Sequence, residues 1–105
     1  MIDQIMPALD PDEMKASAQQ ASGLLKSLAH EGRLMILCHL VDGEKSVSAL
    51  ETHLGSRQAA VSQQLARLRQ EGIVKTRRDG KTIYYSIAEA KARQTVELMY
   101  KLFCH

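Results

Sequence analysis

The sequence predicts a mainly α-helical domain that carries one small β-hairpin. Residues 46–54 and 57–71 both favour helix and are joined by a tight turn that contains glycine, which is typical of a helix-turn-helix. Residues 73–78 and 81–87 are rich in β-branched and aromatic side chains, and an Asp-Gly dipeptide separates them, which is typical of a hairpin. The expected fold class is therefore a winged helix-turn-helix, with two helices before it and one after it.

Length and composition restrict the function. A chain of 105 residues forms one domain with a modest core. The formal net charge is only +2, so binding to nucleic acid would have to depend on local clusters of charge. The sequence contains no stretch suited to crossing a membrane and no secretory signal pattern, and we expect a cytoplasmic protein with no contact to membranes.

Two helices are expected before the helix-turn-helix. Residues 1–11 are predicted to be a flexible N-terminal segment and residues 12–105 the folded domain, with Asp10 and Pro11 marking the start of a helix that ends near Leu28. Its narrow apolar face is rich in alanine and is compatible with ordinary core packing or with a dimer contact. A second helix over residues 30–41 is apolar nearly all round, which predicts a central, buried element.

The second helix of the helix-turn-helix has an unusual surface. Val61, Leu65 and Leu68 form one apolar seam, while the other faces carry amides, hydroxyls and guanidiniums. Amides and guanidiniums form paired hydrogen bonds with base edges in the DNA major groove. Considered alone, such a helix is more often a solvated surface element. The candidate base-reading residues are Gln58, Ser62, Gln63, Gln64 and Arg67.

The hairpin is basic near its tip. Lys75, Arg77, Arg78 and Lys81 are opposed by Asp79 alone. A basic hairpin is commonly just a soluble one, but directly after a reading helix it is well placed to contact phosphates beside the groove. We therefore expect double-stranded DNA as a partner, with Arg77, Arg78 and Lys81 as candidate phosphate contacts.

The last helix is expected to run from about Ala88 to the C-terminus. Val96, Met99, Tyr100 and Phe103 form an apolar stripe that is wide for a domain whose core residues 24–87 already supply. This surplus suggests that a partner chain covers part of the stripe, together with the first helix.

Residues 15–105 resemble the ArsR-type winged-helix repressors. The resemblance lies in four segments, residues 24–37, 59–65, 68–74 and 78–85. It implies a homodimer built from the first and last helices, which binds a palindromic operator as a repressor and is released by an inducer. Nothing in the sequence suggests an enzyme, since a set of nucleophile, base and orienting group is missing, and no cofactor is expected.

The chain departs from the metal-sensing members of that family. Their thiolate pair would fall near residues 49–53, where no cysteine occurs, and the zinc-ligand spacing is not found on the last helix. The two cysteines, Cys38 and Cys104, resemble instead those of the persulfide-responsive BigR and SqrR subgroup. HlyU-type regulators share the same arrangement. The resemblance implies that Cys38 and Cys104 sense reactive sulfur species, with persulfides or polysulfides as the inducer.

The chemistry of two thiols explains how such sensing would work. A thiolate attacks the outer sulfur of a persulfide, and a second thiolate converts the product into a bridge. A direct disulfide needs Cα atoms about 4.4–6.8 Å apart. We expect the reduced cysteines to lie slightly too far apart for this, so that a bridge with inserted sulfur is favoured.

Several alternatives stay open at this stage. Cys38 alone would be an ordinary small buried side chain. Cys38-His39 and Cys104-His105 contain four possible zinc ligands, although adjacent helical residues point about 100° apart and do not easily face one ion. The chain could also be a redox- or metal-responsive regulator of the HlyU kind, or a winged-helix module that binds proteins and not DNA.

Overall fold

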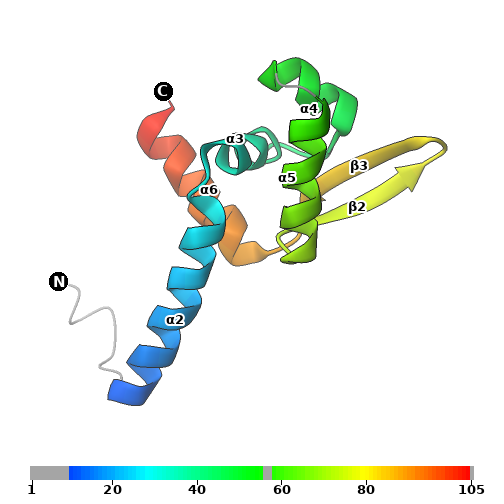
Figure 1. Cartoon of the computed structure of the whole chain (residues 1–105). Helices are drawn as coiled ribbons and strands as arrows, with labels where there is room; N and C mark the ends of the chain where they lie inside the picture. Colours follow the sequence, from blue (N-terminus) through cyan, green and yellow to red (C-terminus); the bar gives the residue numbers. More distant parts are fainter. Residues whose placement is uncertain (1–9, 56–57, 105) are drawn as a thin grey trace.

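A computed structural model describes residues 10–55 and 58–104 of the chain, and it confirms the winged helix-turn-helix (Figure 1). Most of the predicted flexible segment, residues 1–9, lies outside the described residues, as do Arg57 and His105. The helices are α2 (Pro11–Leu28), α3 (Glu31–His39), α4 (Val47–Leu54), α5 (Gln58–Gln70) and α6 (Ala90–Phe103), and the strands are β1 (Lys45–Ser46), β2 (Val74–Asp79) and β3 (Thr82–Ile87).

Side-chain caps define where the first two helices begin. Oδ1 of Asp10 accepts hydrogen bonds from the backbone N–H groups of Asp12 and Glu13, at 2.9 and 3.0 Å, as the sequence predicted for the start of α2. Nδ1 of His30 accepts from the N–H of Gly32 at 3.0 Å and caps α3. The predicted helix over residues 30–41 was too long at its end, because Leu40 and Val41 already form a turn.

The helix-turn-helix is made by α4 and α5. Oγ of Ser46 accepts a hydrogen bond from the N–H of Ala49 at 3.1 Å and caps α4. Gly55 ends α4 with a left-handed φ of 64°, a conformation that glycine adopts without a steric penalty. The seam of Val61, Leu65 and Leu68 is buried, as predicted, and this fixes which face of α5 points outward.

The wing is an antiparallel hairpin of β2 and β3 in which Val74 pairs with Ile87 and Asp79 with Thr82. Its two turn residues are Gly80 and Lys81, one position later than the predicted Asp-Gly turn. Gly80 has a φ of 63° and Lys81 has a negative φ, which is the pattern of a type II′ turn with glycine first.

A third strand, β1, was not predicted. Lys45 and Ser46 pair with Tyr85 and Tyr84, so that the sheet has the order β1-β3-β2. A strand of two residues is too short for a period of alternation to show in the sequence. The two tyrosines have different surroundings: Tyr85 packs against the core, while Tyr84 lies under the guanidinium of Arg77.

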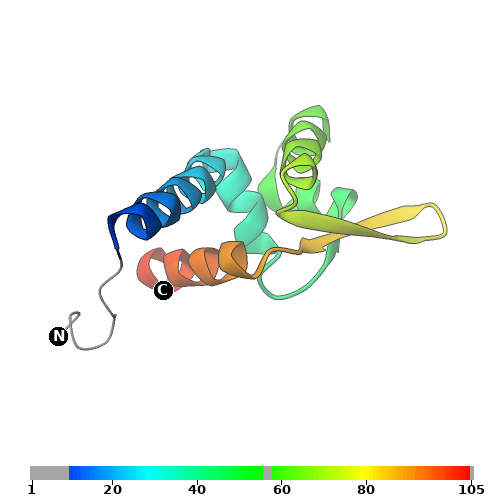
Figure 2. The same ribbon diagram turned by 90° about the horizontal axis from the view of Figure 1, so that it is seen from below.

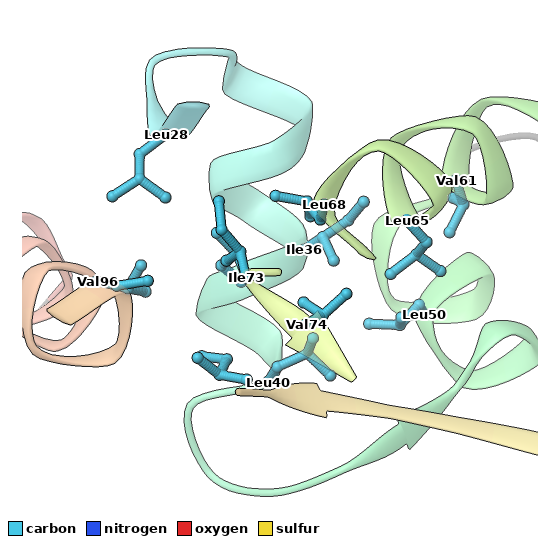
Figure 3. Close-up of a cluster of buried hydrophobic side chains, with 13 residues drawn as sticks. Leu28, Ile36, Leu40, Leu50, Val61, Leu65, Leu68, Ile73, Val74 and Val96 are labelled. Atoms are coloured by element: carbon cyan, nitrogen blue, oxygen red, sulfur yellow. The ribbon is translucent and has the colours of Figure 1, made fainter. Parts of the chain in front are cut away.

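The core lies where α3, α4, α5 and the start of the wing meet (Figure 3). Its fully buried side chains include Leu37, Leu40, Leu50, Leu65 and Leu68. Because α3 buries Ile36 and Leu37 and packs against both α5 and α6, the prediction that this helix is central is confirmed, although Met35 leaves one of its faces exposed.

The helices α2 and α6 lie on the side of the molecule opposite the hairpin (Figures 1 and 2). Residues 11–23 of α2 are all exposed, and Leu28 is the residue of this helix that is buried. The start of α6 buries Ala92 and Val96. Within the described ranges, no helix is long and apolar enough to cross a membrane.

Candidate nucleic-acid interface and thiol pocket

The outer face of α5 presents most of the predicted base-reading residues. Ser62, Gln63 and Arg67 are exposed, and Gln64 is half-buried. Gln58 opens the helix, but its side chain is not described. Nε of Arg67 lies 3.4 Å from Oε1 of Glu71, the residue that directly follows α5. An exposed pair of this kind is weak, so Arg67 can exchange Glu71 for another acceptor at little cost.

Gln64 is held from within the chain by Arg33. Nη1 of Arg33 donates to the amide oxygen of Gln64 at 3.3 Å, and Nε donates to the carbonyl of Ser27 at 2.7 Å. Arg33 thus joins the end of α2 to the reading helix. Because the amide oxygen of Gln64 accepts from Arg33, its NH₂ group stays available as a donor. No sequence signal indicated this contact, which spans 31 residues.

The predicted phosphate contacts on the wing differ in their surroundings. Arg78 and Lys81 are exposed near the tip. Arg77 is engaged by Glu44, with Nε 3.1 Å from Oε2, and its guanidinium lies 4.8 Å from the ring centroid of Tyr84. The hydrogen bond between them lowers the pKa of Glu44 and raises the pKa of Arg77. A phosphate that binds Nε or Nη2 of Arg77 would therefore have to displace the carboxylate of Glu44.

Both cysteines line one pocket, of about 820 Å³, between α3 and the end of α6. We call it the thiol pocket. Cys38 lies in α3 and is half-buried, Cys104 caps the end of α6 and is exposed, and both are free thiols. The apolar walls are Leu34, Met35, Val41, Met99, Tyr100 and Phe103. The sequence suggested the two thiols as a pair, but it gave no indication of these walls.

The pocket disfavours the charged form of Cys38. Burial raises the pKa of the Cys38 thiol, and the charge of a nearby Cys104 thiolate raises it further. The thiolate is the nucleophilic form of cysteine. The more exposed Cys104 is therefore better placed to react with a persulfide first, and Cys38 second.

Four polar side chains complete the pocket where α3 approaches α4. The rings of His39 and His53 are stacked, with centroids 5.3 Å apart and an angle of 15° between the planes. Nζ of Lys45 and Oδ1 of Asp42 form an ion pair at 2.6 Å. Burial lowers the pKa of His39, and the charges of His53 and Lys45 lower it further, against the opposing effect of Asp42. His53 itself is exposed.

The histidine stack predicts a dependence of stability on pH. The folded-state pKa of His39 lies below its ordinary value of 6.5, so the unfolded chain binds this proton more readily. The contribution of neutral His39 to the free energy of unfolding is therefore fully present above pH 6.5. It is lost as the pH falls from 6.5 through the lowered pKa of the folded state. We expect the melting temperature to fall less between pH 7.5 and 5.5 in a His39→Gln variant than in the unchanged chain, which thermal denaturation followed by circular dichroism measures. An equal fall in the variant and in the unchanged chain would contradict this account, because the two proteins share His30 and His53 and differ only at His39.

Metal ligation has little support from the geometry. Among the residues with described positions, no three His, Cys, Asp or Glu side chains converge in a way that could hold a metal ion. His105, one of the four ligands considered from the sequence, lies outside the described residues.

Comparison with known proteins places this architecture among bacterial regulators. Residues 30–76 match the family described as bacterial regulatory protein, arsR family. The chain is 46% identical over 104 residues to the biofilm growth-associated repressor of Xylella fastidiosa (strain Temecula1), covering 99% of this chain and 91% of that one.

Solved structures of two bacterial regulators have the same fold as this chain. The crystal structure of the transcriptional repressor BigR from Xylella fastidiosa superposes with a TM-score of 0.82 at 46% identity, covering 92% of this chain and 99% of that one. Reduced HlyU from Vibrio cholerae superposes with a TM-score of 0.85 at 41% identity, covering 89% and 98%.

Proposed function

Because the chain belongs to the arsR family of bacterial regulatory proteins, we propose that this DNA-binding transcriptional repressor is controlled by sulfur chemistry at Cys38 and Cys104. Its relatives are transcriptional regulators and not enzymes. In the proposed cycle, a cytoplasmic homodimer binds a palindromic operator and is released when persulfides or polysulfides bridge the two cysteines. The observation that carries the proposal is that both thiols line the same pocket of one chain.

The bridging reaction balances without an added oxidant. The Cys104 thiolate attacks the outer sulfur of a persulfide R–S–SH, which yields the Cys104 persulfide and releases the thiol R–SH. Cys38 is converted in the same way. The terminal sulfur of the Cys104 persulfide then attacks Sγ of the Cys38 persulfide and expels hydrosulfide, which leaves one sulfur inserted between the two cysteines.

The fold offers a route from the bridge to the DNA. Cys38 lies in α3, which packs against the reading helix α5 as well as against α6. Arg33, in the first turn of α3, holds Gln64 of α5. A bridge that pulls α3 toward the end of α6 would shift both contacts. Allosteric coupling is typically about 1–3 kcal/mol, which changes operator affinity by about 5- to 150-fold.

The homodimer is proposed from the surface opposite the wing. The helix α2 has 18 residues and buries Leu28 alone, whereas helices in proteins gain most of their stability from packing an apolar face, which favours a second partner for α2. Met14 and Leu25 of α2 and Leu98 and Leu102 of α6 are large apolar side chains left exposed. A dimer through α2 and α6 would cover them and would place the two reading helices about 34–36 Å apart, one turn of DNA.

A titration of operator affinity tests the proposal. A palindromic DNA duplex should bind the reduced protein in a salt-dependent manner, and glutathione persulfide should weaken this binding, while zinc and hydrogen peroxide should not. A response to zinc or peroxide of the same size would favour the redox- or metal-responsive alternative. Binding with no dependence on the palindrome would favour a protein-interaction module.

Mass spectrometry tests the predicted bridge. Digestion after treatment with glutathione persulfide should yield the Cys38 and Cys104 peptides joined with added sulfur. A plain disulfide as the sole product would contradict the expectation that the reduced cysteines are too far apart for a direct bond.

Substitutions on α5 and the wing should separate base reading from phosphate contact. We expect Gln63→Ala and Arg67→Ala each to weaken specific binding by about 1–3 kcal/mol and to relax sequence preference. Arg78→Ala should weaken all sequences alike and reduce the slope of log affinity against log salt by about 1. Fluorescence anisotropy on operator and scrambled duplexes at several salt concentrations measures both. The same loss in all three variants would mean that this division of contacts is wrong.

A further inference from the structure

We propose that the thiol pocket binds the organic group of the persulfide, so that the protein takes sulfur from an organic persulfide with a weakly polar substituent in preference to inorganic polysulfide. This inference rests on the proposed function, which it makes more specific. It concerns the step before sulfur transfer, in which the donor is bound non-covalently beside the two thiols.

The size of the pocket supports an organic donor. A hydrosulfide or short inorganic polysulfide needs only a few times the roughly 30 Å³ that one water molecule occupies in the liquid. The thiol pocket has about 820 Å³, within the range of about 300–1,000 Å³ that is usual for small organic ligands. Two thiols that reacted only with inorganic sulfur would not require this space.

The walls favour a weakly polar substituent. Leu34, Met35, Met99, Tyr100 and Phe103 form a nearly continuous apolar lining, and Phe103 is 77% exposed in the free chain. Contact with a ligand would remove this surface from water, which is favourable in proportion to the apolar area. The thioethers of Met35 and Met99 are polarisable and adapt their shape to different ligands.

The polar groups of the pocket do not favour a highly charged ligand. Lys45 is paired with Asp42, so its charge is already compensated. The pKa of His39 is lowered, which keeps this ring neutral at pH 7. A donor with several charges, such as glutathione persulfide, therefore gains less in this pocket than an aromatic or alkyl persulfide of similar size.

Binding can be measured without sulfur transfer. Benzyl methyl sulfide has the shape of an aromatic persulfide but no transferable sulfur. In the reduced full-length protein labelled with ¹³C on its methionine methyl groups, we expect this probe to shift the signals of Met35 and Met99. Met14, exposed on α2, serves as the internal control and should not shift. Unchanged Met35 and Met99 signals, or equal shifts at all three, would overturn the inference.

Kinetics provides the second test. The rate of sulfur incorporation should saturate with increasing benzyl persulfide and should rise linearly with inorganic tetrasulfide. Phe103→Ala should raise the half-saturating concentration by about 3- to 10-fold, the scale of a lost apolar contact. Ile83→Ala, an apolar truncation in β3 that lies outside the pocket lining and away from α2 and α6, should leave it unchanged.

The two tests distinguish this inference from the proposed function. If both sulfur donors react linearly and Phe103→Ala has no effect, yet the bridge still forms, the donor site is wrong while sulfur sensing stands. If no donor produces a bridge, the proposed function itself fails, and shifts at Met35 and Met99 would then identify only an apolar ligand site.

Discussion

Replacing Cys104 with serine should leave operator affinity nearly unchanged and abolish its loss on exposure to persulfide. The hydroxyl is close in size to the thiol but forms no sulfur bridge. Cys104 is exposed, and its contribution to the end of α6 is a backbone hydrogen bond to the carbonyl of Tyr100 at 2.8 Å, which serine keeps. In the unchanged chain, persulfide should lower operator affinity by about 5- to 150-fold, and in the Cys104→Ser variant it should have no effect. Anisotropy titrations before and after persulfide treatment measure it.

Cys38 requires two variants, because it is half-buried against the core. A serine hydroxyl placed there without a partner costs about 1–3 kcal/mol, so Cys38→Ser alone could lose DNA binding through instability. Cys38→Ala keeps an apolar side chain and avoids that cost. Both variants should bind the operator and ignore persulfide. A variant of either cysteine that keeps the full response rules out the bridge, whereas melting temperatures identify any loss that comes from unfolding.

The fold was predictable where local signals were strong. The start of α2 at Asp10, the buried seam of α5 and the glycine of the hairpin each depend on residues close together in the chain, and each prediction is confirmed. The turn lies one residue later than predicted, because Asp79 pairs with Thr82 and extends β2 by one position. The register seen in the structure places Gly80 where a positive φ is needed.

Features that depend on distant parts of the chain were not predictable. Glu44 reaches Arg77 only because β1 joins the sheet, and Arg33 reaches Gln64 only because α3 crosses α5. Two of the predicted DNA contacts, Arg77 and Gln64, are therefore already engaged within the chain, which residue type and spacing do not reveal. The walls of the thiol pocket have the same origin, because the packing of α3 against α6 decides that Met35 and Met99 face one space.

The second large effect is expected at the proposed dimer surface. Leu98 and Leu102 lie one turn apart on α6 and are 50% and 55% exposed, so a Leu98→Glu/Leu102→Glu variant should keep the fold of the single chain. Four carboxylates would meet across a symmetric interface if the helices pair there, and burying like charges is strongly unfavourable. We expect the variant to be a monomer at micromolar concentration and the unchanged chain to be a dimer, and analytical ultracentrifugation measures the difference.

Loss of the dimer should have a large effect on DNA binding. A dimer that contacts two half-sites gains about 10²–10⁴ in affinity over either contact alone, so the variant should bind a palindrome no better than a single half-site. Ser48→Glu/Thr52→Glu on α4 is the matched control for oligomeric state, because it adds the same two charges, one turn apart, at exposed positions away from α2 and α6. If the α6 variant stays dimeric while its circular dichroism is unchanged, these side chains do not form the interface. The thiol pocket would then act within each chain without a demonstrated link to the spacing of the reading helices.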